Sequence, residues 1–199
     1  MNEIADSPVD PPVVIVDHRA SWRGDFVRIA ATLRAALGAL ASRIDHIGST
    51  SVPDLCAKDV IDVQISVAAL DARVVDALTT IGYTQVDWIV RDHRPPDGVG
   101  PDSDWEKLYF RPPPGQRRTH THVRVLGRPN QRYALLFRDY LIAHPQTAAA
   151  YGELKRRLAA SLANPADYPD VKDPAVDLIY LPAQRWAVET RWQPRPPDA

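Results

Sequence analysis

The fold of this chain is decided between residues 45 and 67, which read DHIGSTSVPDLCAKDVIDVQISV. The last seven of these residues alternate apolar and polar side chains, which is the pattern of a strand with one face in a core and one polar face. Asp62 and Gln64 belong to the polar face. The segment therefore predicts a strand that carries one carboxylate, followed two positions later by an amide rather than by a second acid.

A glycine and a serine connect this strand to a shorter apolar strand that ends before Gly48. Glycine lets the backbone approach a ligand closely, and the hydroxyl of Ser49 with the following amides can bind a phosphate. Lys58 adds a point charge, and Asp62 is placed to hold Mg²⁺ against the phosphates. The alternative is a plain strand-to-helix turn with Ser49 or Thr50 as the helix cap.

The composition of the 199 residues limits the classes of protein to consider. A chain of this length builds one well-cored domain, and its hydrophobic content of 45% is that of an ordinary globular protein. With 24 basic and 25 acidic residues the net charge is −1, so binding to nucleic acid or to a membrane surface is not expected. Cys56 is the single cysteine and the N-terminus lacks a long apolar run, which predicts a cytoplasmic protein without a membrane span.

Hydrophobic periodicity divides the rest of the chain into helices and strands. Steps of three and four predict helices from Ser21 to about Leu40, over 69–81, and in two or three segments after 129, the last from about Pro174 to Trp192. Steps of two predict strands over 61–67, 83–90, 107–111 and 118–125, the last two as a hairpin. We therefore expect an α+β (α/β) fold, a mixed sheet with helices on one face, a polar and partly open second face, and a C-terminal helical segment.

Proline marks both ends of the folded part. Residues 1–12 and 193–199 predict flexible N-terminal and C-terminal tails, because proline-rich stretches continue neither helix nor sheet. Between them we expect a single domain over 13–192, with the mixed-sheet core in 13–128 and the helical part in 129–192. The proline- and glycine-rich stretch 94–101 predicts a long loop, either an irregular connection or a lid.

Four basic side chains share one face of the predicted strand 118–125, namely Arg118, His120, His122 and Arg124. Successive residues on one face of a strand lie about 7 Å apart, so they predict a cationic row that suits several phosphate oxygens. The alternatives are a solvated edge strand whose charges prevent aggregation, and ligation of a metal by the two histidines.

Several separated motifs resemble the GrpB family. They are HIGSTSVP at 46–53, Lys58, IDVQ at 61–64, HV at 122–123, FRDYL at 137–141, AHP at 143–145, Tyr151 and LK at 154–155. The resemblance covers about residues 14–190. That family is similar to the polymerase-beta-type nucleotidyltransferase superfamily, and its domain is also found fused to dephospho-CoA kinase. The resemblance implies a nucleotidyltransferase-like, mostly antiparallel mixed sheet followed by a helical part.

The resemblance also has consequences for the site. Arg138 and Lys155 match motif positions and would close over a nucleotide, the alternative being two ordinary surface cations. Active members of the wider superfamily hold two Mg²⁺ ions with carboxylates two residues apart on one strand and a third acid on a neighbouring strand. Gln64 occupies the second place and brings no negative charge. This chain has Asp54 and Asp59 where the family has glycine and proline, and either acid replaces the missing one only if the loop folds back.

Three functions are compatible with these residues. The first is transfer of a nucleotidyl or phosphoryl group from a nucleoside triphosphate, with Asp62 and His122 as catalytic residues and Asp62 holding Mg²⁺. The second is a catalytically degenerate module for a nucleotide or CoA-like ligand, which Gln64 favours. The third is an interaction protein whose cationic strand face meets an acidic partner. In the first two, a small phosphate-bearing ligand would contact Gly48, Ser49, Lys58, Gln64, His120, Arg124, Arg138 and Lys155.

Overall fold

The computed structural model describes residues 12–199, and within them five strands form one sheet. They are β1 (Ala41–Ile47), β2 (Ile61–Val67), β3 (Thr84–Gln85), β4 (Leu108–Arg111) and β5 (Thr119–Val125), in the order β1-β2-β5-β4-β3. β2 and β5 pair in parallel, and the other three pairs are antiparallel. The predicted mixed, mostly antiparallel sheet is confirmed, and so is the hairpin of β4 and β5.

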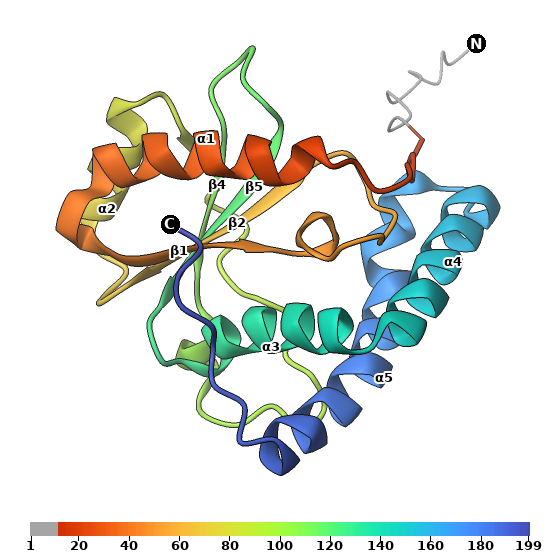
Figure 1. Cartoon of the computed structure of the whole chain (residues 1–199). Helices are drawn as coiled ribbons and strands as arrows, with labels where there is room; N and C mark the ends of the chain where they lie inside the picture. Colours follow the sequence, from red (N-terminus) through yellow and green to blue (C-terminus); the bar gives the residue numbers. More distant parts are fainter. Residues whose placement is uncertain (1–11) are drawn as a thin grey trace, which may run out of the picture.

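Two helices, α1 (Ser21–Leu37) and α2 (Ala72–Thr80), pack on the apolar face of this sheet. Figure 1 shows α1 running across it. The stripe predicted for the first helix is buried against the inward side chains of β2, as Trp22, Phe26, Ala30 and Leu33 meet Ile61, Val63 and Ile65. Asp71 caps α2, because its side chain accepts a hydrogen bond from the amide of Arg73. The spacing of apolar residues in these segments therefore predicts correctly which face of the first helix and of β2 is buried in the main core.

The C-terminal part forms a second layer of helices, α3 (Pro129–Ala143), α4 (Pro145–Ser161) and α5 (Tyr168–Glu189). α3 lies on the opposite side of the sheet from α1 (Figure 1). Apolar residues of all three helices pack with Ile47, Val52 and Leu55 in a second core. The polar face that we expected to be partly open is covered near Gln64, whose Nε2 donates to the carbonyl of Gln131 in α3 at 3.2 Å. No helix in the described part is long and apolar enough to cross a membrane.

Two predicted elements have different bounds in the structure. The strand expected over 83–90 ends at Gln85, and the chain then turns, with the amide of Ile89 donating to the carbonyl of Val86. Trp88, which would have been an inward residue of that strand, is 76% exposed. The last helix begins at Tyr168 rather than near Pro174 and continues through that proline. Both differences matter for the site, because they place further side chains around the polar face.

The long connection from Gln85 to Leu108 is tied to the sheet by Asp92. Its carboxylate accepts two hydrogen bonds from the guanidinium of Arg124, both at 2.7 Å, one from Lys107 at 2.7 Å and one from Asn130 at 3.1 Å. Burial by itself would raise the pKa of Asp92, but Arg124 and Lys107 hold that pKa well below its usual range. This buried ion group joins the connection, β5 and α3.

The C-terminal segment runs from the end of α5 past α3 and reaches the edge strand β1 at the chain end (Figure 1). Ile44 and Ala199 exchange backbone hydrogen bonds of 3.2 and 3.1 Å, and Arg43 donates to the carbonyl of Arg195 at 3.0 Å. We expected a flexible tail over 193–199, and the structure instead places this segment on β1, whose outer edge offers free backbone groups. Of the N-terminal tail expected over 1–12, residues 1–11 lie outside the described part.

The Asp92 ion group should contribute strongly to stability. Asp92→Ala leaves Arg124 and Lys107 buried without a counter-charge, so we expect the free energy of unfolding to fall by about 3–5 kcal/mol. Urea unfolding followed by circular dichroism measures it. The control is Asp102→Ala, which removes exposed ion pairs to Arg91 and Arg94 and should change stability by less than about 1 kcal/mol. Equal effects of the two substitutions would contradict this role of Asp92.

Candidate functional site

The site begins where β1 ends, at Gly48. This residue has a φ of 69° and ψ of −173°, a conformation that residues with a side chain rarely adopt. A Cβ atom there would lie 2.8 Å from Cγ of Asp62 and still closer to its Oδ2. The glycine is therefore needed twice, for its backbone conformation and for the space that the Asp62 carboxylate occupies.

The predicted turn after Gly48 is a single 3₁₀ turn, Ser49–Ser51, rather than the start of a capped helix. Ser49 and Thr50 do not serve as helix caps. Ser49 Oγ instead accepts a hydrogen bond from Nζ of Lys155 at 2.8 Å, and Thr50 Oγ1 lies 2.9 Å from Nε2 of His46. The turn therefore presents the Ser49 hydroxyl to α4.

A cavity of about 260 Å³ opens beside this turn, between the sheet and helices α4 and α5. It brings together five of the residues predicted for the site, in that Ser49, Lys58, Asp62, His120 and Lys155 all line it and Gly48 lies directly behind Asp62. Tyr151, Tyr168 and Lys172 complete the polar part of its wall. Three lysines and a single carboxylate therefore share this wall, and Nζ of Lys172 also lies 3.7 Å from Oδ1 of Asp173.

Lys155 is the most enclosed of these cations, with only 3% of its surface exposed. Its Nζ donates to Ser49 Oγ and to the carbonyl of Cys56, at 2.8 and 2.5 Å, and lies 4.6 Å from the ring centre of Tyr151. Burial, helped by the nearby charge of Lys172, lowers the pKa of Lys155 to about 8. Near pH 7 this lysine is mostly charged, and it loses that charge at mildly alkaline pH.

Lys58 lines the same cavity. Its Nζ is 4.1 Å from the ring centre of Tyr168, a cation–π contact that fixes the ammonium group at the wall. Burial and the charges of Lys172 and Arg118 lower the pKa of Lys58. Mutual repulsion of these cations is relieved when an anion binds among them, which is the electrostatic requirement of a phosphate site.

The register of β2 and β5 decides which histidine accompanies Asp62. Asp62 is opposite His120 and Gln64 is opposite His122. Nδ1 of His120 lies 3.0 Å from Oδ1 of Asp62. The two residues proposed as catalytic, Asp62 and His122, are therefore two register positions apart on adjacent strands, and His120 is the direct neighbour of the carboxylate.

The expected cationic row on β5 does not form. Arg118 is exposed beyond the strand, His120 contacts Asp62, and Arg124 is neutralised by Asp92. Burial beside Lys107 and Arg124 holds the pKa of His122 well below its usual value, so that its ring is neutral near pH 7. The positive charge of the cavity comes from Lys58 and from the helices instead of from this strand.

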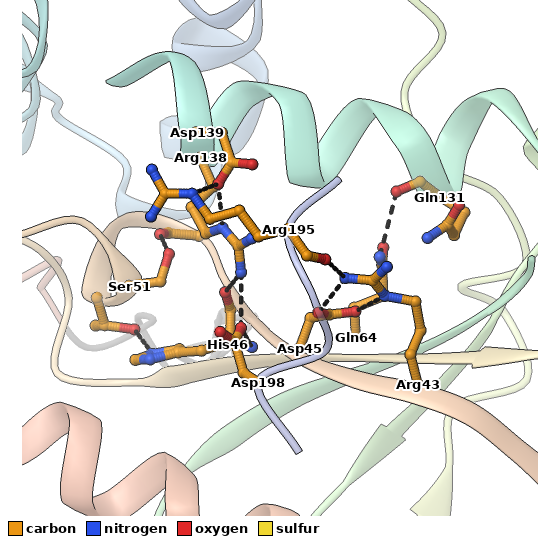
Figure 2. A network of polar contacts seen from close by, with 12 residues as sticks. Arg43, Asp45, His46, Ser51, Gln64, Gln131, Arg138, Asp139, Arg195 and Asp198 are labelled. Atoms are coloured by element: carbon orange, nitrogen blue, oxygen red, sulfur yellow. Dashed lines mark hydrogen bonds and ion pairs between the residues drawn. The ribbon is translucent and has the colours of Figure 1, made fainter. Parts of the chain in front are cut away.

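Gln64, Arg124 and Arg138 lie apart from the cavity wall, as His122 does. Arg124 Nη1 donates to Oε1 of Gln64 at 2.6 Å, so with the bond to Gln131 the buried amide of Gln64 has partners at both ends. Arg138 contacts Asp139, the carbonyl of His46 and Asp198, as Figure 2 shows. None of these three side chains lines the cavity that contains Asp62.

Comparison with known proteins places this site in a family. A model of the GrpB protein family matches residues 12–181. The chain belongs to the GrpB family. A crystal structure of the conserved protein GrpB from Enterococcus faecalis aligns with a TM-score of 0.66 at 28% identity, over 87% of this chain and 99% of that one. A structure of Cid1 in complex with its short product ApU aligns with a TM-score of 0.46 at 11% identity, over 71% of this chain and 40% of that one.

A relative with a curated name is the dephospho-CoA kinase of Mycolicibacterium paratuberculosis. It is 37% identical over 199 aligned residues, which cover 92% of this chain and 49% of the relative. This GrpB chain thus spans about half the length of that kinase.

In this GrpB chain the residues around the cavity do not fit a two-metal site. Asp62 is the one acid in the cavity wall. Asp59 is engaged by Arg19, Trp22 and Arg117 near α1, and Asp54 is exposed on the loop. No cluster of three or more histidine, cysteine, aspartate or glutamate ligands occurs within residues 12–199. Neither loop acid therefore replaces the carboxylate missing at Gln64.

Asp54, where the resemblance implied a glycine, has a φ of 61°. This value lies in the left-handed region, which glycine adopts without strain and other residues rarely adopt.

Sequence reasoning missed the contributions of α5 to the site. Lys172 and Tyr168 line the cavity because α5 begins at Tyr168, six residues before the predicted start. A signal was present in the sequence, since Asn164 caps the short turn Pro165–Asp167 that leads into the helix. Tyr151 is a motif residue of the resemblance, and its contact with Lys155 follows from their spacing of four residues on the one helix α4.

The contact between Gly48 and Asp62 predicts a large effect of a small substitution. Gly48→Ala adds a clash with Asp62 to the backbone strain of a positive φ, and we expect a loss of about 3 kcal/mol or more in unfolding free energy. Chemical denaturation measures it.

Gly115→Ala is the matched control, because Gly115 has a φ of 79° and nothing within 4 Å of an added Cβ. It should show the strain alone, about 1–2 kcal/mol. If Gly48→Ala and Gly115→Ala lose the same unfolding free energy, the close contact between residue 48 and Asp62 does not contribute to stability.

Proposed function

We propose that this GrpB-family chain binds the phosphate groups of a nucleotide in the cavity between the Ser49–Ser51 turn, β2, α4 and α5. The observation that carries the proposal is the charge of the wall, in which Lys58, Lys155 and Lys172 surround one carboxylate, Asp62. Ammonium groups and a serine hydroxyl are suitable partners for phosphate oxygens, and an enclosed position strengthens these interactions.

The lysines are held in place before any ligand arrives. Lys155 is fixed by Ser49 and the Cys56 carbonyl, and Lys58 by the ring of Tyr168. Such preorganisation supports binding, because less side-chain freedom is lost when the ligand is bound. Repulsion among the ammonium groups further favours an anion over a neutral ligand.

Binding without group transfer is the form of this proposal that the acids support best. Two closely spaced divalent ions need more than one carboxylate, and Asp62 stands alone in the wall. In this proposal magnesium reaches the site together with a nucleotide, with Asp62 as the one carboxylate able to contact it. The nucleotide is held mainly by the lysines.

Nucleotidyl or phosphoryl transfer is the second candidate. The observation in its favour is that Asp62 is fixed from two sides, by the backbone of Gly48 and by His120 at 3.0 Å. A carboxylate that served only to balance the charge of the lysines would not need such a fixed position. The fixed position of Asp62 therefore favours a specific role in transfer. The cytoplasm, where nucleotides and dephospho-CoA are present, is the location that fits either candidate.

Calorimetric titration tests the binding proposal. We expect ATP, or another of GTP, CTP, UTP and dephospho-CoA, to bind with EDTA present, and Lys155→Met to weaken binding by about tenfold or more, equivalent to about 1.4 kcal/mol. Arg157→Met is the matched control on the same helix, because Arg157 is exposed and pairs with Glu153. The proposal is wrong if none of the five ligands binds. It is also wrong if Lys155→Met and Arg157→Met both bind the ligand with the affinity of the unchanged protein. Release of pyrophosphate or phosphate in a parallel titration with Mg²⁺ in place of EDTA would favour the transfer candidate.

The pH dependence of binding follows from Lys155. Its pKa of about 8 means that its positive charge is present below this pH and is lost as the pH rises through it. We therefore expect the affinity for the nucleotide to fall between about pH 7 and pH 9, as Lys155 loses its charge. A lysine with the ordinary pKa of about 10.4 would keep its charge over this range and would cause no such fall. Lys155→Met should remove this dependence. An affinity that stays constant over this range in the unchanged protein would show that Lys155 does not contact the phosphates.

A further inference from the structure

A second cavity, of about 580 Å³, lies on the other side of the Ser49–Ser51 turn. Ser49 lines the candidate nucleotide site, whereas its neighbours Thr50 and Ser51 line this second cavity. Its other walls come from α1, from the end of β1, from α3 and from the C-terminal segment. The function proposed above makes no use of it.

Two hydrogen-bond donors converge on one point in this cavity. Nη1 of Arg138 and the backbone amide of His46 both donate to Oδ2 of Asp198, at 2.7 and 2.9 Å. Figure 2 shows the carboxylate between the strand and the guanidinium. Because β1 is an edge strand, the outward amide of His46 has no strand partner and can donate to an anion.

The guanidinium of Arg138 still has unused capacity. Only 4% of its side chain is exposed, and its Nη2 atom is buried without a hydrogen-bond partner among residues 12–199. Leaving a buried charged donor unpaired costs free energy, about 1–3 kcal/mol or more. A single carboxylate oxygen from Asp198 therefore satisfies only part of what this arginine can bind, and an anion with more oxygens would satisfy more of it.

The rest of the cavity wall fits an anionic ligand with an apolar part. Arg23 stands at the wall, and no ion pair of Arg23 is found in the part of the chain that the structure describes. Phe26, Val27 and Ile142 supply apolar surface. Asp198 is the one acid that lines the cavity.

We propose that this cavity is a second binding site, for a small molecule that carries a carboxylate or phosphate group, and that Asp198 occupies its anion position in the absence of that ligand. The ligand group would accept hydrogen bonds from Arg138 and from the amide of His46 in place of Asp198. The side chain of Asp198 is 37% exposed, so it can leave the position without unfolding the core. The C-terminal segment thus acts as an intramolecular competitor.

Nuclear magnetic resonance of the full ¹⁵N-labelled chain tests this proposal residue by residue. The probes are inorganic phosphate and butyrate, which separate a phosphate ligand from a carboxylate with an apolar tail. We expect the amide signals of His46, Thr50 and Ala199 to shift, with an apparent affinity about tenfold higher in Asp198→Ala than in the unchanged chain, because the competitor is removed. Asp97→Ala, an exposed loop substitution, is the control and should leave the affinity unchanged.

A second variant tests whether the anion binds in this cavity at all when Asp198 is replaced. Arg23→Ala, combined with Asp198→Ala, should weaken binding of the preferred probe, since Arg23 is exposed and its removal does not disturb packing. Equal affinity in the unchanged chain and in Asp198→Ala, or no shift at His46 and Ala199, overturns the proposal. Signals of Ser49 and Lys58 report separately on the nucleotide site, so the two proposals fail independently.

Discussion

The close approach of Gly48 to the carboxylate of Asp62 is the contact on which the rest of the site depends. It lets β1 turn sharply at its end while remaining paired with β2, where Ile47 is opposite Asp62. The turn that follows directs Ser49 towards Lys155, and the same strand pairing sets Asp62 beside His120. A side chain at residue 48 would push these elements apart, because neither backbone nor a strand carboxylate can move far within a sheet.

The electrostatics of the molecule are divided into two separate groups. Beneath α3, Asp92 pairs with both Arg124 and Lys107, so this part of the polar face is a structural ion group. At the other end of the same face, Lys58, Lys155 and Lys172 line a cavity in which Asp62 is the one acid. Even with Lys172 paired to Asp173, the other two lysines outnumber this carboxylate and leave an excess of positive charge. The net charge of −1 conceals this separation, since a total says nothing about where charges lie.

Much of the fold could be predicted from local patterns. The period-two segment 61–67 and the helical stripe of α1 correspond to real elements because each has one clear apolar face. The site could be predicted only in part. Gly48, Ser49, Lys58, Asp62 and Lys155 meet as expected, because the glycine turn, the strand and the family motifs all mark them.

The predictions that failed have a common physical cause. They concern side chains whose partners lie far away in the sequence, and a local pattern does not show which distant residue becomes the partner. Alternation shows that Arg124 and Gln64 share a face, but not that Asp92 and Gln131 cover them. For the same reason the sequence does not show whether the basic side chains of β5 form a free cationic row or are paired with acids. Lys172 was missed through the boundary of α5, and element boundaries are where pattern reasoning is weakest.

A crystal structure of the full chain grown at neutral pH with a non-hydrolysable ATP analogue would show whether this cavity binds phosphate. We predict phosphate oxygens within hydrogen-bond distance of Nζ of Lys155 and Lys58 and of the Ser49 hydroxyl, with Asp62 facing them. A nucleotide bound elsewhere, with this cavity empty under saturating analogue, would contradict it.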